Sequence, residues 1–157
     1  MKIDPGVLTD QPKLKEMLDQ FIGCRDDRSS WEYSLYPSLT LKYASSSKLV
    51  WEFQVEKQHC NMTGNVHGGC VASLVDECSG FAAFTHQGRN QWKNFGVSVN
   101  ISASYLRGIP GGETARVEVT TERVGKTLAN FYVKIFDAKG RLCYTGNHTV
   151  FCTDPKL

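Results

Sequence analysis

The sequence predicts a single α+β domain in which a curved, mostly antiparallel sheet wraps around one long buried helix, with an extra helix at the N-terminus. Six segments alternate apolar and polar residues with the period of two that is typical of β-strands. One segment, residues 67–85, is small or apolar on nearly every helical face, which indicates a buried helix. At 157 residues the chain is long enough for one domain with a substantial core.

The N-terminal helix is expected at residues 11–22, where apolar side chains repeat on one helical stripe. This stripe consists of Leu14, Met17, Leu18, Phe21 and Ile22. Asp10 is the expected N-cap, and Gly23 is the expected stop. Residues 24–37 are polar and aromatic, so we expect them to be irregular. Residues 1–37 then form an N-terminal extension, and residues 38–157 form the main domain.

The strands fall on both sides of the buried helix. A hairpin is expected at residues 38–45 and 49–56, around a Ser-Ser-Ser-Lys turn. Four more strands are expected after the helix, at residues 96–106, 113–124, 127–136 and 142–151, and three Gly-containing turns separate them. Short connections require mostly antiparallel pairing. A curved sheet around a single helix is the hotdog fold, whereas a βαβ fold alternates its elements along the chain.

The composition excludes several classes of function. Eighteen Lys and Arg residues against sixteen Asp and Glu leave a net charge of +2, which is too weak to indicate a nucleic-acid partner. No apolar run approaches the roughly 18 residues of a membrane span, and the N-terminus resembles neither a signal nor a transit peptide. We therefore expect a cytoplasmic protein, with the mitochondrion as the alternative. The three Asn-x-Ser/Thr sequences, at Asn61, Asn100 and Asn147, are then not glycosylated.

The cysteines indicate neither disulfides nor a metal site. Six are present, at positions 24, 60, 70, 78, 143 and 152, and no two form a Cys-x-x-Cys pair. The spacing of His59, Cys60, His67 and Cys70 matches no common zinc pattern. We expect reduced cysteines and no bound metal.

The buried helix begins at a Gly-Gly pair, Gly68 and Gly69. The first turn of a helix has unpaired N–H groups and a partial positive charge, and glycine lets a ligand oxygen approach them closely. Such a site suits a carbonyl oxygen that becomes negative during acyl transfer. The alternative is that the two glycines only start the helix tightly.

Asp76 lies in the middle of this apolar helix. A buried, unpaired carboxylate is costly, so such a residue is usually paired or functional, and we interpret Asp76 as a candidate general base. The alternative is a carboxylate that is hydrogen-bonded to a neighbouring strand. Eight residues separate Gly68 from Asp76, about 12 Å along a helix. Both can act on one substrate only if the helices of two subunits lie side by side and antiparallel, which predicts at least a homodimer.

A longer pattern contains these residues. Residues 61–76 read Asn-x-x-Gly-x-x-His-Gly-Gly-x-x-x-x-Leu-x-Asp, and Val-Ser-Val-Asn and Gly-Lys-Thr-Leu follow at residues 97–100 and 125–128. This pattern resembles the PaaI-type hotdog thioesterases. The resemblance implies an acyl-CoA thioesterase that hydrolyses acyl-CoA to the free acid and CoA. It also implies a dimer of hotdog subunits, or a tetramer, in lipid metabolism, with no cofactor, since CoA is part of the substrate.

The resemblance also implies a role for each site residue. Asn61 and the N–H of Gly68 polarise the thioester carbonyl, and His67 shapes their loop. Asp76 of the partner subunit, helped by Ser98, activates the water. Whether Asp76 acts as a base or as a transient nucleophile stays open. No Gly-x-Ser-x-Gly elbow occurs, so a serine nucleophile is not expected.

The strand at residues 96–106 admits a plainer interpretation of its serine. Ser98, Asn100, Ser102 and Ser104 alternate along it and would share one polar face. The resemblance places CoA at the end of this strand and at the Gly-Lys-Thr turn. The residues available there are Asn100, Tyr105, Arg107, Arg123, Gly125, Lys126 and Thr127. Arg and Lys suit phosphates, and a glycine turn exposes N–H groups, although charges at hairpin ends can simply be solvated.

Two other functions and one local departure stay open at this point. A hotdog hydratase or dehydratase would pair a histidine with a carboxylate, here His67 with Asp76. A non-catalytic acyl-CoA-binding protein would keep the pocket without turnover. Residues 86–95 are longer than usual for these thioesterases and carry Trp92 and Phe95. They could form a lid or line the acyl tunnel.

Overall fold

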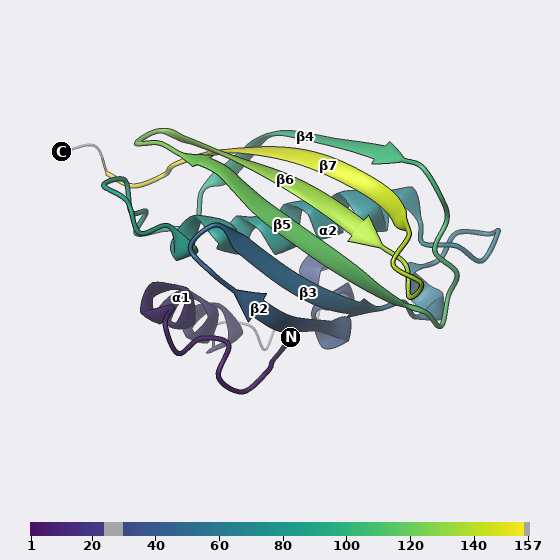
Figure 1. Ribbon diagram of the computed structural model, residues 1–157. Coiled ribbons are helices and arrows are strands. Elements are labelled where there is room, and N and C mark those ends of the chain that lie inside the picture. The colour runs from purple at the N-terminus through teal and green to yellow at the C-terminus, as the bar shows by residue number, and fades with distance from the viewer. Residues whose placement is uncertain (24–29, 156–157) are drawn as a thin grey trace.

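Seven strands form one curved sheet, and helix α2 (Gly68–Gly80) lies along one face of it (Figure 1). The computed structural model describes residues 1–23 and 30–155. The strands are β1 (Lys2–Ile3), β2 (Leu39–Ala44), β3 (Lys48–Gln54), β4 (Val97–Tyr105), β5 (Thr114–Val124), β6 (Leu128–Phe136) and β7 (Leu142–Phe151). Their order in the sheet is β1-β2-β3-β5-β6-β7-β4, and all the pairs except β1 with β2 are antiparallel. The predicted sheet around a buried helix is confirmed.

Helix α1 (Pro12–Gly23) is the predicted N-terminal helix, but its start differs from the prediction. Its first backbone bond runs from the Lys15 N–H to the Gln11 carbonyl, at 2.9 Å. Gln11 therefore occupies the cap position, and the prediction of Asp10 as N-cap is wrong. The physical reason is Pro12, whose fixed φ suits the first helical position. The helix buries Leu14, Met17 and Leu18.

The N-terminal extension joins the sheet as well as covering it. Lys2 and Ile3 pair in parallel with Thr40 and Leu41 of β2. A strand of two residues is too short to show an alternating pattern, so the sequence did not reveal it. Residues 31–34 and 36–38 form two 3₁₀ helices within the segment that we expected to be irregular. The remainder of that segment, residues 24–29, lies outside the described residues.

The buried helix is shorter than the predicted 67–85. Helix α2 ends at Gly80 and continues as a 3₁₀ helix, η4 (Phe81–Thr85), whose five residues are all buried. Phe81 lies against Trp51 of β3, with ring centroids 5.8 Å apart, and against Phe21 of α1 at 5.1 Å. The core thus extends beyond α2 into the space between the sheet and α1. No helix of the described residues is long and apolar enough to cross a membrane.

The described cysteines are all unpaired, and Cys24 lies outside the described residues. Burial raises the pKa of the Cys70 thiol to about 12, with Cys60 adding to the effect. A thiol that stays protonated is a poor nucleophile and a poor metal ligand. Cys70 therefore acts as a small apolar side chain in the core.

Helix α2 lies very close to the sheet at Gly146 of β7. A Cβ atom at this glycine would lie 2.5 Å from Val75 Cγ2 and 3.1 Å from the carbonyl oxygen of Ser102. The first distance is too short for two carbon atoms and the second is tighter than most such contacts, so a glycine lets the helix approach to this depth. The contact fixes Val75 against the sheet and thereby the position of Asp76, the next residue of α2.

We expect Gly146→Ala to lower the free energy of unfolding by roughly 1–3 kcal/mol, because the added methyl group overpacks the interface between α2 and β7. Chemical denaturation measures the change. Asn147→Ala is the matched control: Asn147 lies on the same strand but is exposed, and its effect should stay within about 0.5 kcal/mol. Equal stability of the two variants would contradict this role of Gly146.

Candidate active site

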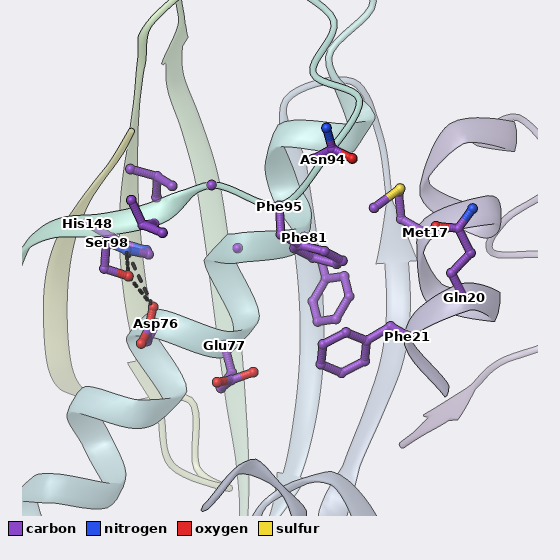
Figure 2. A pocket seen from close by; sticks show the side chains of 14 residues that line it. Met17, Gln20, Phe21, Asp76, Glu77, Phe81, Asn94, Phe95, Ser98 and His148 are labelled. Atoms are coloured by element: carbon purple, nitrogen blue, oxygen red, sulfur yellow. Dashed lines mark hydrogen bonds and ion pairs between the residues drawn. The ribbon is translucent and has the colours of Figure 1, made fainter. Parts of the chain in front are cut away.

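A chain of four polar side chains runs from Asp76 on α2 into the core, and Figure 2 shows its outer part. Ser98 Oγ donates to Asp76 Oδ1 at 2.9 Å. His148 Nε2 lies 2.9 Å from Ser98 Oγ and 3.4 Å from Asp76 Oδ1. On the inner side, His148 Nδ1 lies 2.6 Å from Ser79 Oγ. His148 is 2% exposed and Asp76 is 40% exposed, so the chain links a buried imidazole to an open carboxylate.

A β-bulge in β4 directs the side chain of Ser98 toward Asp76 and His148. Ser98 pairs with Val150 and Asn100 pairs with Thr149, which leaves Val99 as an extra residue on β4. Since neighbouring residues of β7 point to opposite faces, the bulge puts Ser98 and Asn100 on opposite faces of the sheet. The shared polar face that we predicted for them is therefore wrong. The bulge turns Ser98 inward, toward α2.

The hydrogen bonds also determine which of these polar side chains donates a proton and which accepts it. Ser79 Oγ donates to the Val75 carbonyl at 2.6 Å, so it accepts the N–H of His148 Nδ1. Burial lowers the pKa of His148 below its ordinary 6.5, although the neighbouring Asp76 acts in the opposite direction. A neutral His148 with its proton on Nδ1 then has an acceptor at Nε2. The Ser98 hydroxyl proton can therefore go to Asp76 or to His148, but not to both.

His148 is the site residue that the sequence interpretation missed. It lies on β7 at an inward position of the same alternation as Tyr144, Gly146 and Val150, all of which are buried. A histidine at an inward position of a strand was the available signal. Its distance of 72 residues from Asp76 along the sequence hid the pairing.

The start of α2 forms the second half of the predicted site. His67 is the N-cap: its Nδ1 accepts the Gly69 N–H at 2.9 Å, which agrees with a residue that shapes the loop. Tyr105 donates its hydroxyl to the Gly68 carbonyl at 3.1 Å and so supports the same turn. Among the described residues, no acceptor lies on the Gly68 N–H.

Asn61 lies in the loop before α2. Its Oδ1 accepts the N–H and the hydroxyl of Thr63, at 2.9 and 2.7 Å, and the N–H of Asn65 at 3.3 Å. These bonds hold the side chain in a turn and use its acceptor. In the described part of the chain no acceptor lies on the amide nitrogen of Asn61, which is the atom suited to donate to a carbonyl oxygen.

One chain does not bring the two halves together. Gly68 and Asp76 lie at positions separated by two turns of one α-helix, as the sequence predicted. Asp76 is also less buried than predicted, at 40% exposure, because one chain leaves this side of α2 uncovered. Strand β4 at the end of the sheet is similarly uncovered, and Val97, Val99 and Leu106 are 55–61% exposed.

A cavity of about 650 Å³ opens beside Asp76. Asp76, Ser98 and His148 lie on one side of it, and Met17 and Phe21 of α1 lie on the other (Figure 2). Phe81 and Phe95 complete the apolar side. Residues 86–95 thus supply a wall residue, Phe95. Trp92 anchors this segment by donating its indole N–H to the Gly125 carbonyl at 2.9 Å.

The residues that we predicted to hold CoA fall at two ends of the sheet. Tyr105 and Arg107 lie at the end of β4, beside the start of α2, and Asn100 lies on the outer face of β4. The β5–β6 turn lies near the opposite end of β4, since Leu128 and Val97 both pair with Phe151. This second group contains Arg123, Gly125, Lys126 and Thr127. Beside it, Arg89 and Lys93 join Lys126 and Thr127 in lining a second cavity of about 630 Å³.

The described residues contain no group of three His, Cys, Asp or Glu side chains suited to a metal ion. His59, one of the four residues considered above for zinc, has a structural role instead. Its Nδ1 accepts the Glu56 N–H at 3.0 Å, and its Nε2 lies 2.8 Å from the Ser34 carbonyl.

The lowered pKa of His148 predicts a pH dependence of stability. Just below pH 6.5 the unfolded chain binds a proton at this histidine, whereas the folded chain binds it only at lower pH. The free energy of unfolding should therefore fall as the pH is lowered through this window. Urea denaturation at several pH values measures this free energy. Its slope against pH should be shallower for His148→Gln than for the wild type. His86→Gln is the control, and an unchanged slope in His148→Gln would contradict the prediction.

Comparisons with known proteins identify the family and the fold. The model of the thioesterase superfamily matches residues 63–144. Human acyl-coenzyme A thioesterase 13 is 35% identical over 113 residues, which cover 71% of this chain and 77% of that protein. The crystal structure of mouse thioesterase superfamily member 2 superposes with a TM-score of 0.73 and 29% identity over 90% of this chain and 96% of that one. The E. coli PaaI protein shares the fold, with a TM-score of 0.74 and 16% identity over 93% and 97% of the two chains. The chain therefore belongs to the hotdog-fold thioesterase superfamily.

Proposed function

We propose that this protein is an acyl-CoA thioesterase that hydrolyses acyl-CoA to the free acid and CoA. The observation that carries the proposal is the placement of Asp76, held by Ser98, at the side of an apolar cavity of about 650 Å³. A carboxylate beside an apolar cavity can activate water next to a bound acyl group. The similarity to acyl-coenzyme A thioesterase 13 supports acyl-CoA as the substrate.

The complete site takes residues from two subunits. The uncovered side of α2 and the exposed valines of β4 are the surfaces that a second copy would bury. With two copies of α2 antiparallel, Gly68 and Asn61 of one chain face Asp76 of the other. This arrangement gives two equivalent sites in a dimer. The pairing of two dimers into a tetramer stays a prediction.

In this site the Gly68 N–H and the Asn61 amide donate to the thioester oxygen, which becomes negative as water attacks. Asp76 takes a proton from the water, whose oxygen forms the new bond to the carbonyl carbon. The carbon–sulfur bond then breaks, and the proton that Asp76 took from the water passes to the leaving sulfur, so CoA leaves as the thiol and Asp76 is ionised again. These steps use protein groups and water alone, so we propose that no cofactor is needed.

The serine between Asp76 and His148 suits both protonation states of Asp76. While Asp76 is ionised, the Ser98 hydroxyl donates to it. When Asp76 has taken a proton from water, it can donate to Ser98 Oγ, and the Ser98 proton turns to the free Nε2 of His148. The low pKa of His148 keeps this acceptor available. Ser98 and His148 therefore keep the carboxyl group oriented through the cycle.

Phosphates of CoA suit the cations at the β5–β6 turn. Lys126 and Thr127 line the cavity of about 630 Å³ together with Arg89 and Lys93, and such side chains bind phosphate oxygens. Tyr105 and Arg107 lie at the other end of β4. They can bind the same CoA molecule only if that molecule spans two subunits. The cytoplasmic location and a role in lipid metabolism stay predictions.

A hydratase is the competing enzyme, because His148 lies 3.4 Å from Asp76. However, His148 is 2% exposed and both of its nitrogens lie against serines, so neither nitrogen is directed at a substrate although the ring borders the cavity. His67, the other candidate, uses Nδ1 to cap α2. The contacts of both histidines thus favour hydrolysis.

Asp76→Asn should lower kcat by roughly 10²–10⁴-fold, because it removes the general base while it keeps the size of the side chain. Thiol release from a panel of acyl-CoAs measures the rate, and water addition to an enoyl-CoA is assayed in parallel. Asp19→Asn, an exposed acid on α1, is the control. Binding without turnover in the wild type would favour an acyl-CoA-binding protein, and enoyl-CoA hydration would favour a hydratase.

The shared site predicts complementation between two inactive variants. Asn61→Ala and Asp76→Ala each disable every site of a homodimer. A mixed dimer of the two has one intact site, so unfolding and refolding an equal mixture should restore about a quarter of the wild-type activity. Absence of recovery, with mixed dimers shown by mass spectrometry, would place the whole site in one chain.

A further inference from the structure

Gly80 is a glycine that the fold itself does not require. It has φ −54° and ψ −35°, a helical conformation that every residue adopts. A Cβ atom at this position would meet no atom within 4 Å in the described structure. Glycine destabilises a helix relative to alanine, and here neither a turn nor a close approach compensates for that cost.

The space beside Gly80 is part of the cavity at Asp76. Gly80 follows Asp76 by four residues, so it lies on the same face of α2, roughly 6 Å further along the helix axis. Any apolar group that extends from a carbonyl at Asp76 along α2 must pass over Gly80. A side chain at this position would project into that path.

Three aromatic rings line the cavity together with Gly80. The ring centroids of Phe21 and Phe81 are 5.1 Å apart, those of Phe81 and Phe95 are 5.4 Å apart, and those of Phe21 and Phe95 are 5.5 Å apart. Each ring thus contacts both others, and together they form an apolar wall of the cavity that joins α1 to residues 86–95. We call these three rings the aromatic wall. An apolar chain that reaches it is removed from water.

We propose that Gly80 and the aromatic wall set the length of the acyl group, with Gly80 leaving the passage open and the wall closing its far end. The proposal rests on the thioesterase function proposed above. The substrates are acyl-CoAs with an apolar chain long enough to pass Gly80 and reach the wall. Helix α1, which contributes Phe21, is then a specificity element as well as a cover for the core.

The test is a series of substitutions at Gly80, assayed with acetyl-CoA and dodecanoyl-CoA. The readout is the ratio of kcat/KM for dodecanoyl-CoA to that for acetyl-CoA. Gly80→Leu should lower this ratio by about 10–200-fold, the loss typical of an apolar pocket that no longer fits its substrate. Gly80→Ala is the matched control, because Ala and Leu have similar helix propensities. It should raise the Tm and change the ratio less.

Phe95→Ala is a second variant, which opens the wall and should shift the ratio toward the longer chain. An unchanged ratio in Gly80→Leu would overturn the proposal. Equal losses on both substrates, or dissociation of the oligomer in Gly80→Leu, would also overturn it, because the space would then serve the partner chain or the reacting carbonyl. If the wild type hydrolyses neither these nor other acyl-CoAs, the proposed thioesterase function is itself contradicted. That outcome differs from an unchanged ratio in an active enzyme, which contradicts only the proposal on acyl length.

Discussion

The close contact between Val75 of α2 and Gly146 of β7 is the constraint on which the rest of this structure depends. It brings the helix onto the sheet at a distance that a glycine permits. Because Val75 points into this contact, the adjacent Asp76 is turned toward β4, and Ser79 one turn later is turned toward His148. The positions of the carboxylate and of its buried partners thus follow from one point of helix packing.

Hydrogen bonding explains why Ser79 and His148 can lie so deep in an apolar core. The polar atoms of both side chains have hydrogen-bond partners: Ser79 bonds the helix backbone and His148, and His148 bonds Ser98. A buried histidine without these partners would be costly. The bulge at Val99 completes the chain of polar side chains by turning Ser98 inward. The carboxylate of Asp76 is therefore held by groups that are themselves hydrogen-bonded within the core.

Helix α1 and residues 86–95 give the cavity its apolar side. Neither segment belongs to the central sheet, yet both place aromatic rings against η4, and Trp92 anchors the second segment to the β5–β6 turn. The groups proposed to act on the thioester, Asp76 and the start of a partner's α2, are thus separated from the segments that shape the apolar side of the cavity. Changes in α1 or in residues 86–95 can alter specificity without moving Asp76.

Local patterns in the sequence were sufficient for most of the elements and for the placing of Gly68 and Asp76 on one helix. Strand alternation and the apolar stretch before Asp76 are properties of neighbouring residues, and they predicted six strands, two helices, Gly68 and Asp76. The sequence also predicted two subunits, because helix geometry alone separates Gly68 from Asp76. Only the tertiary structure decided which face Ser98 takes, that His148 joins it, and that Gly80 borders a cavity. Each of these depends on a bulge or on a contact between residues far apart in the chain, and no periodicity records such contacts.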